Sequence, residues 1–181
     1  MYQEFETQVL DINKEAIIAK LRQLGAKEEP EVLQKRWIFD IEPCTKESTG
    51  RWVRLRQVGK KKPTITYKNR GGKNTGDTTE IEVVVDDFGK TYDLLSAINF
   101  DKGRYYQENK RHKFVIKDIE FTIDTWPMIP PLLEVEARSK EAVAEGLKML
   151  GLTGKEAGDI GMVATYHRYN IEIHSYKELK F

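Results

Sequence analysis

Acidic side chains alternate along short stretches of the chain in a way that suits metal binding. Glu4 and Glu6 lie two residues apart, and so do Glu134 and Glu136, while Asp124 ends an alternating stretch just before the second pair. In an extended strand, residues two apart lie on the same face of the sheet. Carboxylate oxygens facing the same way are the ligands that Mg²⁺ and Mn²⁺ prefer. We therefore expect a divalent metal site built from these five acids.

Basic side chains show the same spacing of two, which suits phosphate binding. Arg54 and Arg56 share one predicted strand face, and Lys68 and Arg111 lie on similar strands further along. Arginine binds phosphate oxygens in a forked geometry, whereas lysine acts as a point charge. A metal ion bound together with a polyphosphate would contact both the acidic and the basic side chains.

Charge is also separated along the chain. Residues 48–76 hold nine basic residues and no acid, whereas residues 77–93 hold six acids and one base. Two neighbouring strands of opposite charge would attract each other if they paired. Glu80 and Glu82 on the acidic stretch, and Arg36 and Lys35 on an earlier strand, are therefore further candidates for the site.

The elements that position these residues are mostly strands. Strict alternation of apolar and polar residues predicts about eight strands with short turns, one of them a hairpin turn at Lys117-Asp118, so the sheet should be largely antiparallel. The predicted strands lie near residues 4–9, 37–40, 52–56, 64–68, 80–85, 111–116, 120–124 and 133–136.

Three segments have helical spacing instead. Apolar residues recur every three to four positions in 13–24, 87–98 and 139–150, and a weaker helix is expected after Thr153. Helices covering the apolar face of the sheet give an α+β fold. A charged opposite face is ordinarily a solvated outer surface. Closure of about eight strands into a β-barrel would instead enclose it, with room for one small ligand.

Composition narrows the classes of protein. The chain has 181 residues, a net charge of +1 and a single cysteine, Cys44, which excludes an internal disulfide framework and favours a reducing compartment. Neither a secretory signal nor an apolar stretch of membrane-spanning length is evident, so a soluble cytoplasmic protein without a membrane partner is expected. The chain reads as one domain over residues 1–181.

Seven elements in order give the chain a family resemblance. They are Glu4-Phe5-Glu6-Thr7-Gln8, Arg54-Leu55-Arg56, Thr66-Tyr67-Lys68, Glu80-Ile81-Glu82, Arg111 before Phe114, Phe121-Thr122-Ile123-Asp124 and Leu133-Glu134-Val135-Glu136. This set resembles the CYTH superfamily, the triphosphate tunnel metalloenzymes, which include class IV adenylyl cyclases, thiamine triphosphatases and tripolyphosphatases. The resemblance implies an eight-stranded antiparallel tunnel, Mg²⁺ or Mn²⁺, and a triphosphate substrate such as ATP, thiamine triphosphate or tripolyphosphate.

The resemblance also implies roles for residues. Glu4, Glu6 and Arg111 are expected to take part in catalysis, and Arg54, Arg56, Lys68 and Arg111 to bind phosphates. Two positions depart from the family pattern, since Gln8 and Asn109 stand where lysines are usual. Both replacements remove a cation and favour reduced catalysis.

The sequence is compatible with several functions. The tail Ser175–Leu179 resembles that of class IV cyclases and favours conversion of ATP to cyclic AMP and pyrophosphate. The alternatives are a tripolyphosphatase or thiamine triphosphatase-like hydrolase and a polyphosphate- or nucleotide-binding protein. An RNA-binding module is disfavoured because the interleaved acids would repel a phosphate backbone, so no nucleic-acid partner is expected. The oligomeric state is open, with a homodimer among the alternatives.

Overall fold

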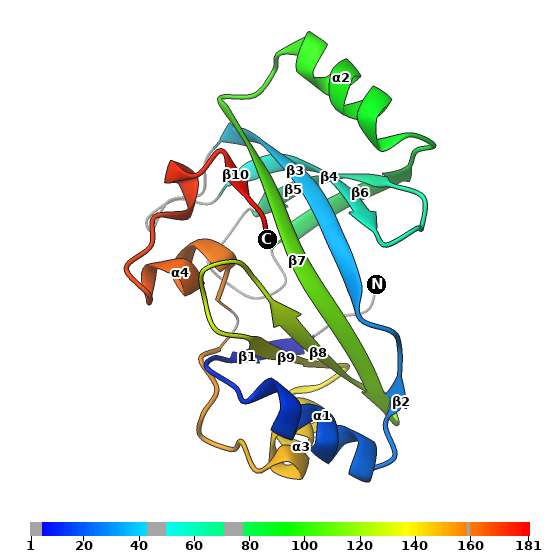
Figure 1. Cartoon of the computed structure of the whole chain (residues 1–181), viewed down its shortest axis with the longest axis vertical. Helices are drawn as coiled ribbons and strands as arrows, with labels where there is room; N and C mark the ends of the chain where they lie inside the picture. Colours follow the sequence, from blue (N-terminus) through cyan, green and yellow to red (C-terminus); the bar gives the residue numbers. More distant parts are fainter. Residues whose placement is uncertain (1–4, 43–49, 71–77, 159) are drawn as a thin grey trace. The chain divides into compact units, whose positions relative to one another are not determined.

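Alternating residues form strands at each of the eight predicted places. In the computed structural model, which describes residues 5–42, 50–70, 78–158 and 160–181, these strands are β1 (Phe5–Val9), β3 (Val32–Glu42), β4 (Arg51–Val58), β5 (Thr64–Arg70), β6 (Thr78–Val84), β7 (Gly103–Ile116), β8 (Ile119–Thr125) and β9 (Leu132–Ala137). Two short strands, β2 (Lys27–Glu28) and β10 (Glu178–Leu179), were not predicted, and β3 and β7 are longer than predicted. Figure 1 shows the elements in chain order.

The helices begin and end close to the predicted residues because their caps are encoded locally. Side chains of Asn13, Asp87 and Ser139 accept hydrogen bonds from backbone N–H groups of the first turns. The helix α3 ends at Gly151, whose φ of 71° is in the left-handed region that glycine adopts without strain. The helices are α1 (Lys14–Gln23), α2 (Phe88–Ile98), α3 (Lys140–Leu150) and α4 (Met162–His167), followed by the 3₁₀ turn η1 (Ile173–Ser175).

The chain divides into two compact units, and β7 contributes to both. The first unit comprises Met1–Val32 and Lys110–Ile171, and the second comprises Leu33–Asn109 and Glu172–Phe181. In the first unit the strand order is β1-β9-β8-β7, every pair antiparallel, with β2 also antiparallel to β7. In the second unit the order is β7-β3-β4-β5-β6, and β10 pairs in parallel with β7.

Each unit has its own apolar core between sheet and helices. In the first unit, α1 and α3 pack on one face of the sheet, where Leu21, Phe114, Phe121 and Val135 are fully buried. In the second unit, Leu95 of α2 packs near Phe39 and Leu55. In both units the alternating glutamates and arginines of the same strands therefore lie on the face opposite the helices. The predicted α+β class, with an antiparallel sheet and covering helices, is confirmed.

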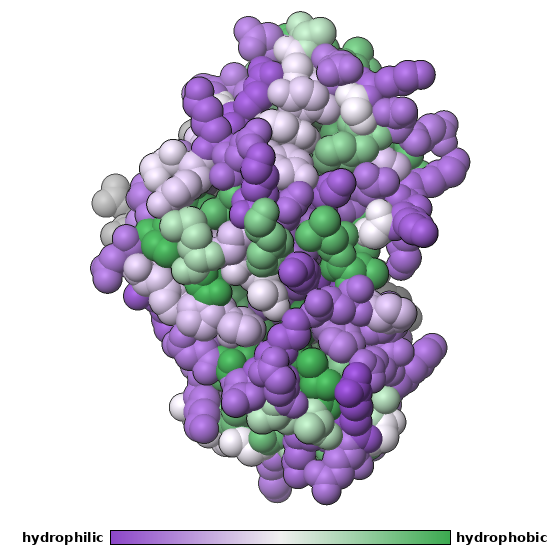
Figure 2. Space-filling model, in the orientation of Figure 1, coloured by the Kyte–Doolittle hydropathy of each residue, from purple (hydrophilic) through white to green (hydrophobic). Residues whose placement is uncertain are grey.

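The surface is mostly hydrophilic on the face drawn in Figure 2, with separate apolar patches. Some large apolar side chains are exposed, among them Ile81, Val83, Leu94 and Ile98. Among the described residues, none of the helices has both the length and the apolar character needed to span a bilayer.

Candidate metal and phosphate site

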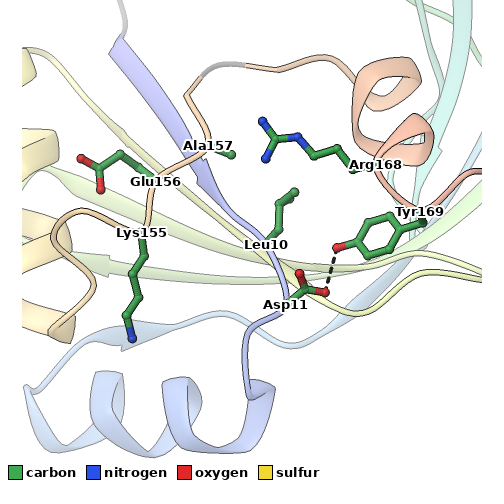
Figure 3. Close-up of a pocket in the computed structure, with 7 residues that line it drawn as sticks. All are labelled: Leu10, Asp11, Lys155, Glu156, Ala157, Arg168 and Tyr169. Atoms are coloured by element: carbon green, nitrogen blue, oxygen red, sulfur yellow. Dashed lines mark hydrogen bonds between the residues drawn. The ribbon is translucent and has the colours of Figure 1, made fainter.

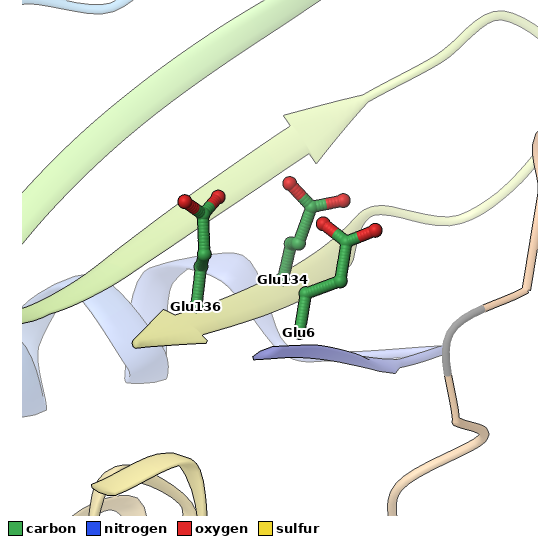
Figure 4. Close-up of side chains that lie close together, drawn as sticks. All are labelled: Glu6, Glu134 and Glu136. Carbon is green, nitrogen blue, oxygen red and sulfur yellow. The ribbon is translucent and has the colours of Figure 1, made fainter. Parts of the chain in front are cut away.

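The polar face of the first unit brings three glutamates together. Register pairs Glu6 directly with Glu136, and Gln8 with Glu134, so all four side chains lie on the same face of β1 and β9. One carboxylate oxygen from each of Glu6, Glu134 and Glu136 lies within 4.8 Å of the other two. Figure 4 shows the three side chains extending to the same side of the neighbouring strands β1 and β9. We call these three residues the glutamate cluster.

The donor set of the glutamate cluster fits a hard divalent cation. Carboxylate oxygens are the preferred ligands of Mg²⁺ and Mn²⁺, and two like charges directly opposite each other across a strand pair repel unless a cation lies between them. Glu6 is exposed and the other two glutamates are half-buried, which leaves an approach open to solvent. Glu4, the fifth predicted metal ligand, lies outside the described residues.

Asp124 lies next to Arg111 and is not part of the glutamate cluster. Arg111 donates two hydrogen bonds to the carboxylate of Asp124, from Nε at 2.9 Å and from Nη2 at 2.6 Å. Asp124 is only 3% exposed, so this forked pair satisfies a buried charge. The same Nη2 lies 3.7 Å from Oε1 of Glu134. Asp124 thus holds Arg111 beside the glutamate cluster.

The charge of Arg111 is strongly held. Burial lowers the pKa of its guanidinium, but the hydrogen bonds and charge of Asp124, with the charge of Glu134, outweigh burial and raise the pKa above its ordinary value. Arg111 therefore stays cationic at every physiological pH. A fixed cation next to three carboxylates is suited to contact a phosphate that approaches them.

Gln8 has two polar partners on this face. It is 7% exposed, its Nε2 donates to Oε2 of Glu134 at 3.5 Å, and its Oε1 accepts from the hydroxyl of Thr165 at 3.4 Å. Thr165, in α4, was not singled out in the sequence. The two residues are 157 positions apart, so no local pattern links them.

The second unit gathers three of the four predicted phosphate-binding cations on one sheet face; the fourth, Arg111, lies in the first unit. The register places Arg36 opposite Arg56, Arg54 opposite Thr66, and Lys68 opposite Glu80. Opposed residues share a face, so Arg36, Arg54, Arg56 and Lys68 lie together, and we call them the basic face. The other candidate, Lys35, pairs with Gln57 on the opposite face and is exposed.

Acids of β6 balance part of this charge. Lys68 forms an ion pair with Glu80, and Arg56 Nη2 lies 3.8 Å from Glu82, which also accepts a 2.8 Å hydrogen bond from Thr66. Burial lowers the pKa of Lys68, and the positive charge of Arg54 lowers it further, against the opposing effect of Glu80. Cations crowded in this way are suited to a polyanion, which would relieve their mutual repulsion.

Asn109, at a position where the family resemblance implies a lysine, contacts an arginine of the basic face. It is fully buried in the second unit, and its side-chain oxygen accepts a hydrogen bond from Nη2 of Arg36. Lys110, the next residue, pairs with Thr125 in the first unit and has the opposite parity, as expected from strand alternation. A neutral acceptor at position 109 thus orients an arginine of the basic face.

A separate small pocket in the first unit lacks convergent polar groups. Its volume is about 280 Å³, near the lower limit for ligand sites. Figure 3 shows Lys155, Glu156 and Arg168 pointing in different directions around it, while Tyr169 donates a 2.9 Å hydrogen bond to Asp11. Burial and this hydrogen bond raise the pKa of Tyr169 to about 12, so its hydroxyl stays protonated. This pocket does not resemble a catalytic site.

Paired acids and a forked arginine in one unit, and a basic strand face in the other, are suited to a divalent cation and to a polyanion. The sequence matches the CYTH domain family over residues 3–159, and the chain belongs to that family. None of the curated proteins compared with the chain matches it.

Solved structures with a similar fold differ widely in sequence. The PH1012 protein from Pyrococcus horikoshii OT3 superimposes with a TM-score of 0.68 at 20% identity, over 87% of this chain and 96% of that one. A putative adenylate cyclase from Vibrio parahaemolyticus has a TM-score of 0.68 at 13% identity, over 91% and 98% of the two chains. The putative adenylyl cyclase HpAC1 from Hippeastrum, described as having a dominant triphosphatase activity, gives 0.57 at 16% identity, over 93% and 96%. These similarities concern the fold.

Proposed function

We propose that this protein is a divalent-metal-dependent enzyme that acts on a triphosphate. The observation that carries the proposal is the glutamate cluster with Arg111 beside it, a metal-binding donor set next to a permanent cation. Membership of the CYTH family supports the same conclusion, because the family acts on triphosphates with a metal.

The chain's residues divide the work by charge. Glu6, Glu134 and Glu136 hold Mg²⁺ or Mn²⁺, with Glu4 as a further ligand, and Asp124 contributes by anchoring Arg111. A bound cation supplies charge neutralisation and Lewis-acid polarisation of phosphate oxygens. Arg36, Arg54, Arg56 and Lys68 bind phosphate oxygens, with Lys68 oriented by Glu80 and Arg56 by Glu82. Arg111 stabilises charge that develops at the reacting phosphorus.

ATP cyclisation is the reaction that we favour. The ribose 3′-hydroxyl attacks the α-phosphorus, an O3′–P bond forms, the bond to the bridging oxygen of pyrophosphate breaks, and the hydroxyl proton is lost to solvent or a carboxylate. The similarity in fold to the Vibrio putative adenylate cyclase supports this choice. So does Trp52, a half-buried aromatic side chain opposite Lys68 on the basic face, which is placed to stack on a nucleobase.

Hydrolysis of a triphosphate is the second candidate. The same groups would then orient water toward the terminal phosphorus, and the triphosphatase activity ascribed to the Hippeastrum neighbour supports it. Neutral Gln8 and Asn109, in place of lysines, favour a third state, tight binding with slow turnover.

The test is a panel of ATP, thiamine triphosphate and tripolyphosphate, each with Mg²⁺ or Mn²⁺. Cyclic AMP, pyrophosphate and phosphate are measured separately. Cyclic AMP with equimolar pyrophosphate supports the cyclase, and phosphate alone from any substrate supports the hydrolase. Binding without any product identifies a binding protein, and an absence of both binding and turnover would contradict the proposal.

Three variants make the panel specific. Glu6→Gln should abolish product formation, whereas Glu145→Gln, an acid-to-amide change in α3 that removes the partner of Lys117, should not. Trp52→Leu should raise the KM for ATP several-fold and leave that for tripolyphosphate unchanged, because only ATP has a base to stack.

A further inference from the structure

The side chain of Gln8 is held in one orientation by its neighbours. A carboxylate only accepts hydrogen bonds, so the amide NH₂ of Gln8 must face Glu134 and its carbonyl oxygen must face Thr165. The hydroxyl of Thr165 has one proton, which it shares between Oε1 of Gln8 at 3.4 Å and the backbone oxygen of Gly161 at 3.3 Å. Thr165 is fully buried, so this hydroxyl has no access to solvent.

Both carboxylate oxygens of Glu134 have a neighbouring polar group. Gln8 donates to Oε2 from β1, and Arg111, fixed by Asp124, approaches Oε1 from β7. Glu134 lies on β9, directly opposite Gln8 of β1 on one side and Thr122 of β8 on the other. The contacts restrict how its carboxylate can turn, while the neutral amide of Gln8 leaves the negative charge of Glu134 intact.

We propose that Gln8 is a positioning residue that orients the Glu134 carboxylate toward the divalent cation, and that Thr165 of α4 fixes Gln8. The inference rests on the proposed metal site. Partners of metal-ligating side chains commonly set metal affinity, and their loss costs about 10- to 100-fold. A lysine at position 8 would instead pair with Glu134 and neutralise part of the charge that attracts the cation.

The lengths of the two hydrogen bonds of Gln8 distinguish a positioning role from a purely structural one. Hydrogen bonds of 3.4 and 3.5 Å are at the long end of the allowed range and contribute little to stability. Removing them should therefore change metal affinity much more than it changes the melting temperature.

The experiment is calorimetric titration of Mn²⁺ into the full chain without substrate. Gln8→Met preserves approximate volume without the amide, and we expect about tenfold weaker Mn²⁺ binding. Thr165→Val, which removes the hydroxyl, should weaken binding about threefold, and Thr165→Ser should bind like the wild type. The double variant Gln8→Met/Thr165→Val should match Gln8→Met alone, because Thr165 acts through Gln8.

Matched controls remove the same groups away from the glutamate cluster. Thr7→Val lies on the same strand but on the helix-covered face, and Gln57→Met lies in the second unit, on the face opposite the basic face; both should bind Mn²⁺ like the wild type.

Each remaining outcome has a distinct meaning. Wild-type affinity in both Gln8→Met and Thr165→Val would overturn the positioning role and leave the metal site standing. If the fold-loss of Mn²⁺ affinity in the double variant equals the product of the two single fold-losses, the link between Thr165 and Gln8 is overturned. If the wild type does not bind Mn²⁺ at all, both this inference and the proposed metal site fail. If Gln8→Met does not fold, the Thr165→Val and Thr165→Ser pair decides the question alone.

Discussion

Individual side chains in this protein are placed where their charges oppose ordinary sheet stability. Glu6 faces Glu136 across an antiparallel pair, and Arg36 faces Arg56 across another. Like charges directly opposite each other destabilise a sheet. Both arrangements become favourable when a cation and a polyanion are bound, so the free protein keeps its site at some cost in stability.

The role of Arg56 can be tested against a matched arginine on the same strand. Arg56→Ala should weaken tripolyphosphate binding by roughly 1.5–3 kcal/mol, the range for hydrogen bonds to charged groups. Arg51→Ala removes an exposed arginine from the opposite face of β4 and should change the affinity little. Isothermal titration of both variants measures this difference; equal losses would mean that the effect is one of overall charge.

Lys68 should make binding depend on pH. Burial and then Arg54 lower its pKa, so the free protein loses this charge at a lower pH than an ordinary lysine does. A bound triphosphate favours the charged form, hence binding takes up a proton and affinity falls as the pH rises through the lowered pKa. Tripolyphosphate affinity measured across alkaline pH should show this fall.

The control for this dependence is Lys68→Arg, because arginine remains charged over the whole range. Any pH dependence of affinity that remains in Lys68→Arg therefore comes from titration of the phosphates of the ligand. Identical pH profiles of the wild type and Lys68→Arg would show that Lys68 does not bind the ligand.

Residue types predicted which acids and cations share a strand face, but not how these residues pair. Strand alternation is local, so it correctly placed Glu6, Arg54 and Lys68 on polar faces. The forked pair between Asp124 and Arg111 depends on register between strands, and the Gln8–Thr165 contact depends on where α4 packs. Neither register nor helix placement is set by residues close in sequence.

Among the elements, α3 approaches its sheet unusually closely at a glycine. A Cβ built at Gly146 would lie 2.9 Å from Cγ1 of Val135 and 3.0 Å from Cγ2 of Ile119. Both neighbours are buried core residues, which leaves them little room to move. The sequence shows only a glycine inside a helical pattern, and this contact explains why it is tolerated there.

Gly146→Ala should therefore destabilise the protein, by about 1–2 kcal/mol, because overpacking outweighs the gain of about 1 kcal/mol in helix propensity. Gly89→Ala in α2 makes the same change where the nearest atom is an ordinary 3.5 Å away, and should be neutral or stabilising. Urea unfolding of both variants measures the two free energies. A stabilised Gly146→Ala would mean that α3 can move away from the sheet.

Element boundaries were predictable where a cap or turn is local. Asn13, Asp87 and Ser139 each cap the first turn of the helix that follows them. Lys117 forms the turn directly after β7. The extension of β7 back to Gly103 and the parallel pairing of β10 were not predicted, because residues 103–108 are polar on both sides and β10 has two residues. Partner strands, not local alternation, stabilise these segments.

At the scale of the whole molecule, metal binding should be visible as added stability. A ligand that binds only the folded state stabilises it by about 2.7 kcal/mol at 100 times its Kd. For a chain of this size that is a rise of roughly 5–10 °C in melting temperature. Differential scanning fluorimetry with Mn²⁺ should show this rise, and excess EDTA should reverse it.

Two variants show whether the rise comes from the glutamate cluster. Glu136→Gln should lose most of this rise in melting temperature, whereas Glu145→Gln, which removes an exposed acid of α3 paired to Lys117, should retain it. An equal rise in Glu136→Gln would place the cation elsewhere.

The division of the first unit between two distant stretches of chain affects how the protein is made. Gln8 and Glu134 are 126 residues apart, and the second unit's strands β4, β5 and β6 lie between them in sequence. During synthesis, the β4–β5–β6 hairpins can fold while β1 still waits for β9. Until β9 emerges from the ribosome, β1 is an unpaired strand and the glutamate cluster does not exist as a group. The nascent chain therefore acquires this cluster late, and β1 is exposed to misassociation for most of translation.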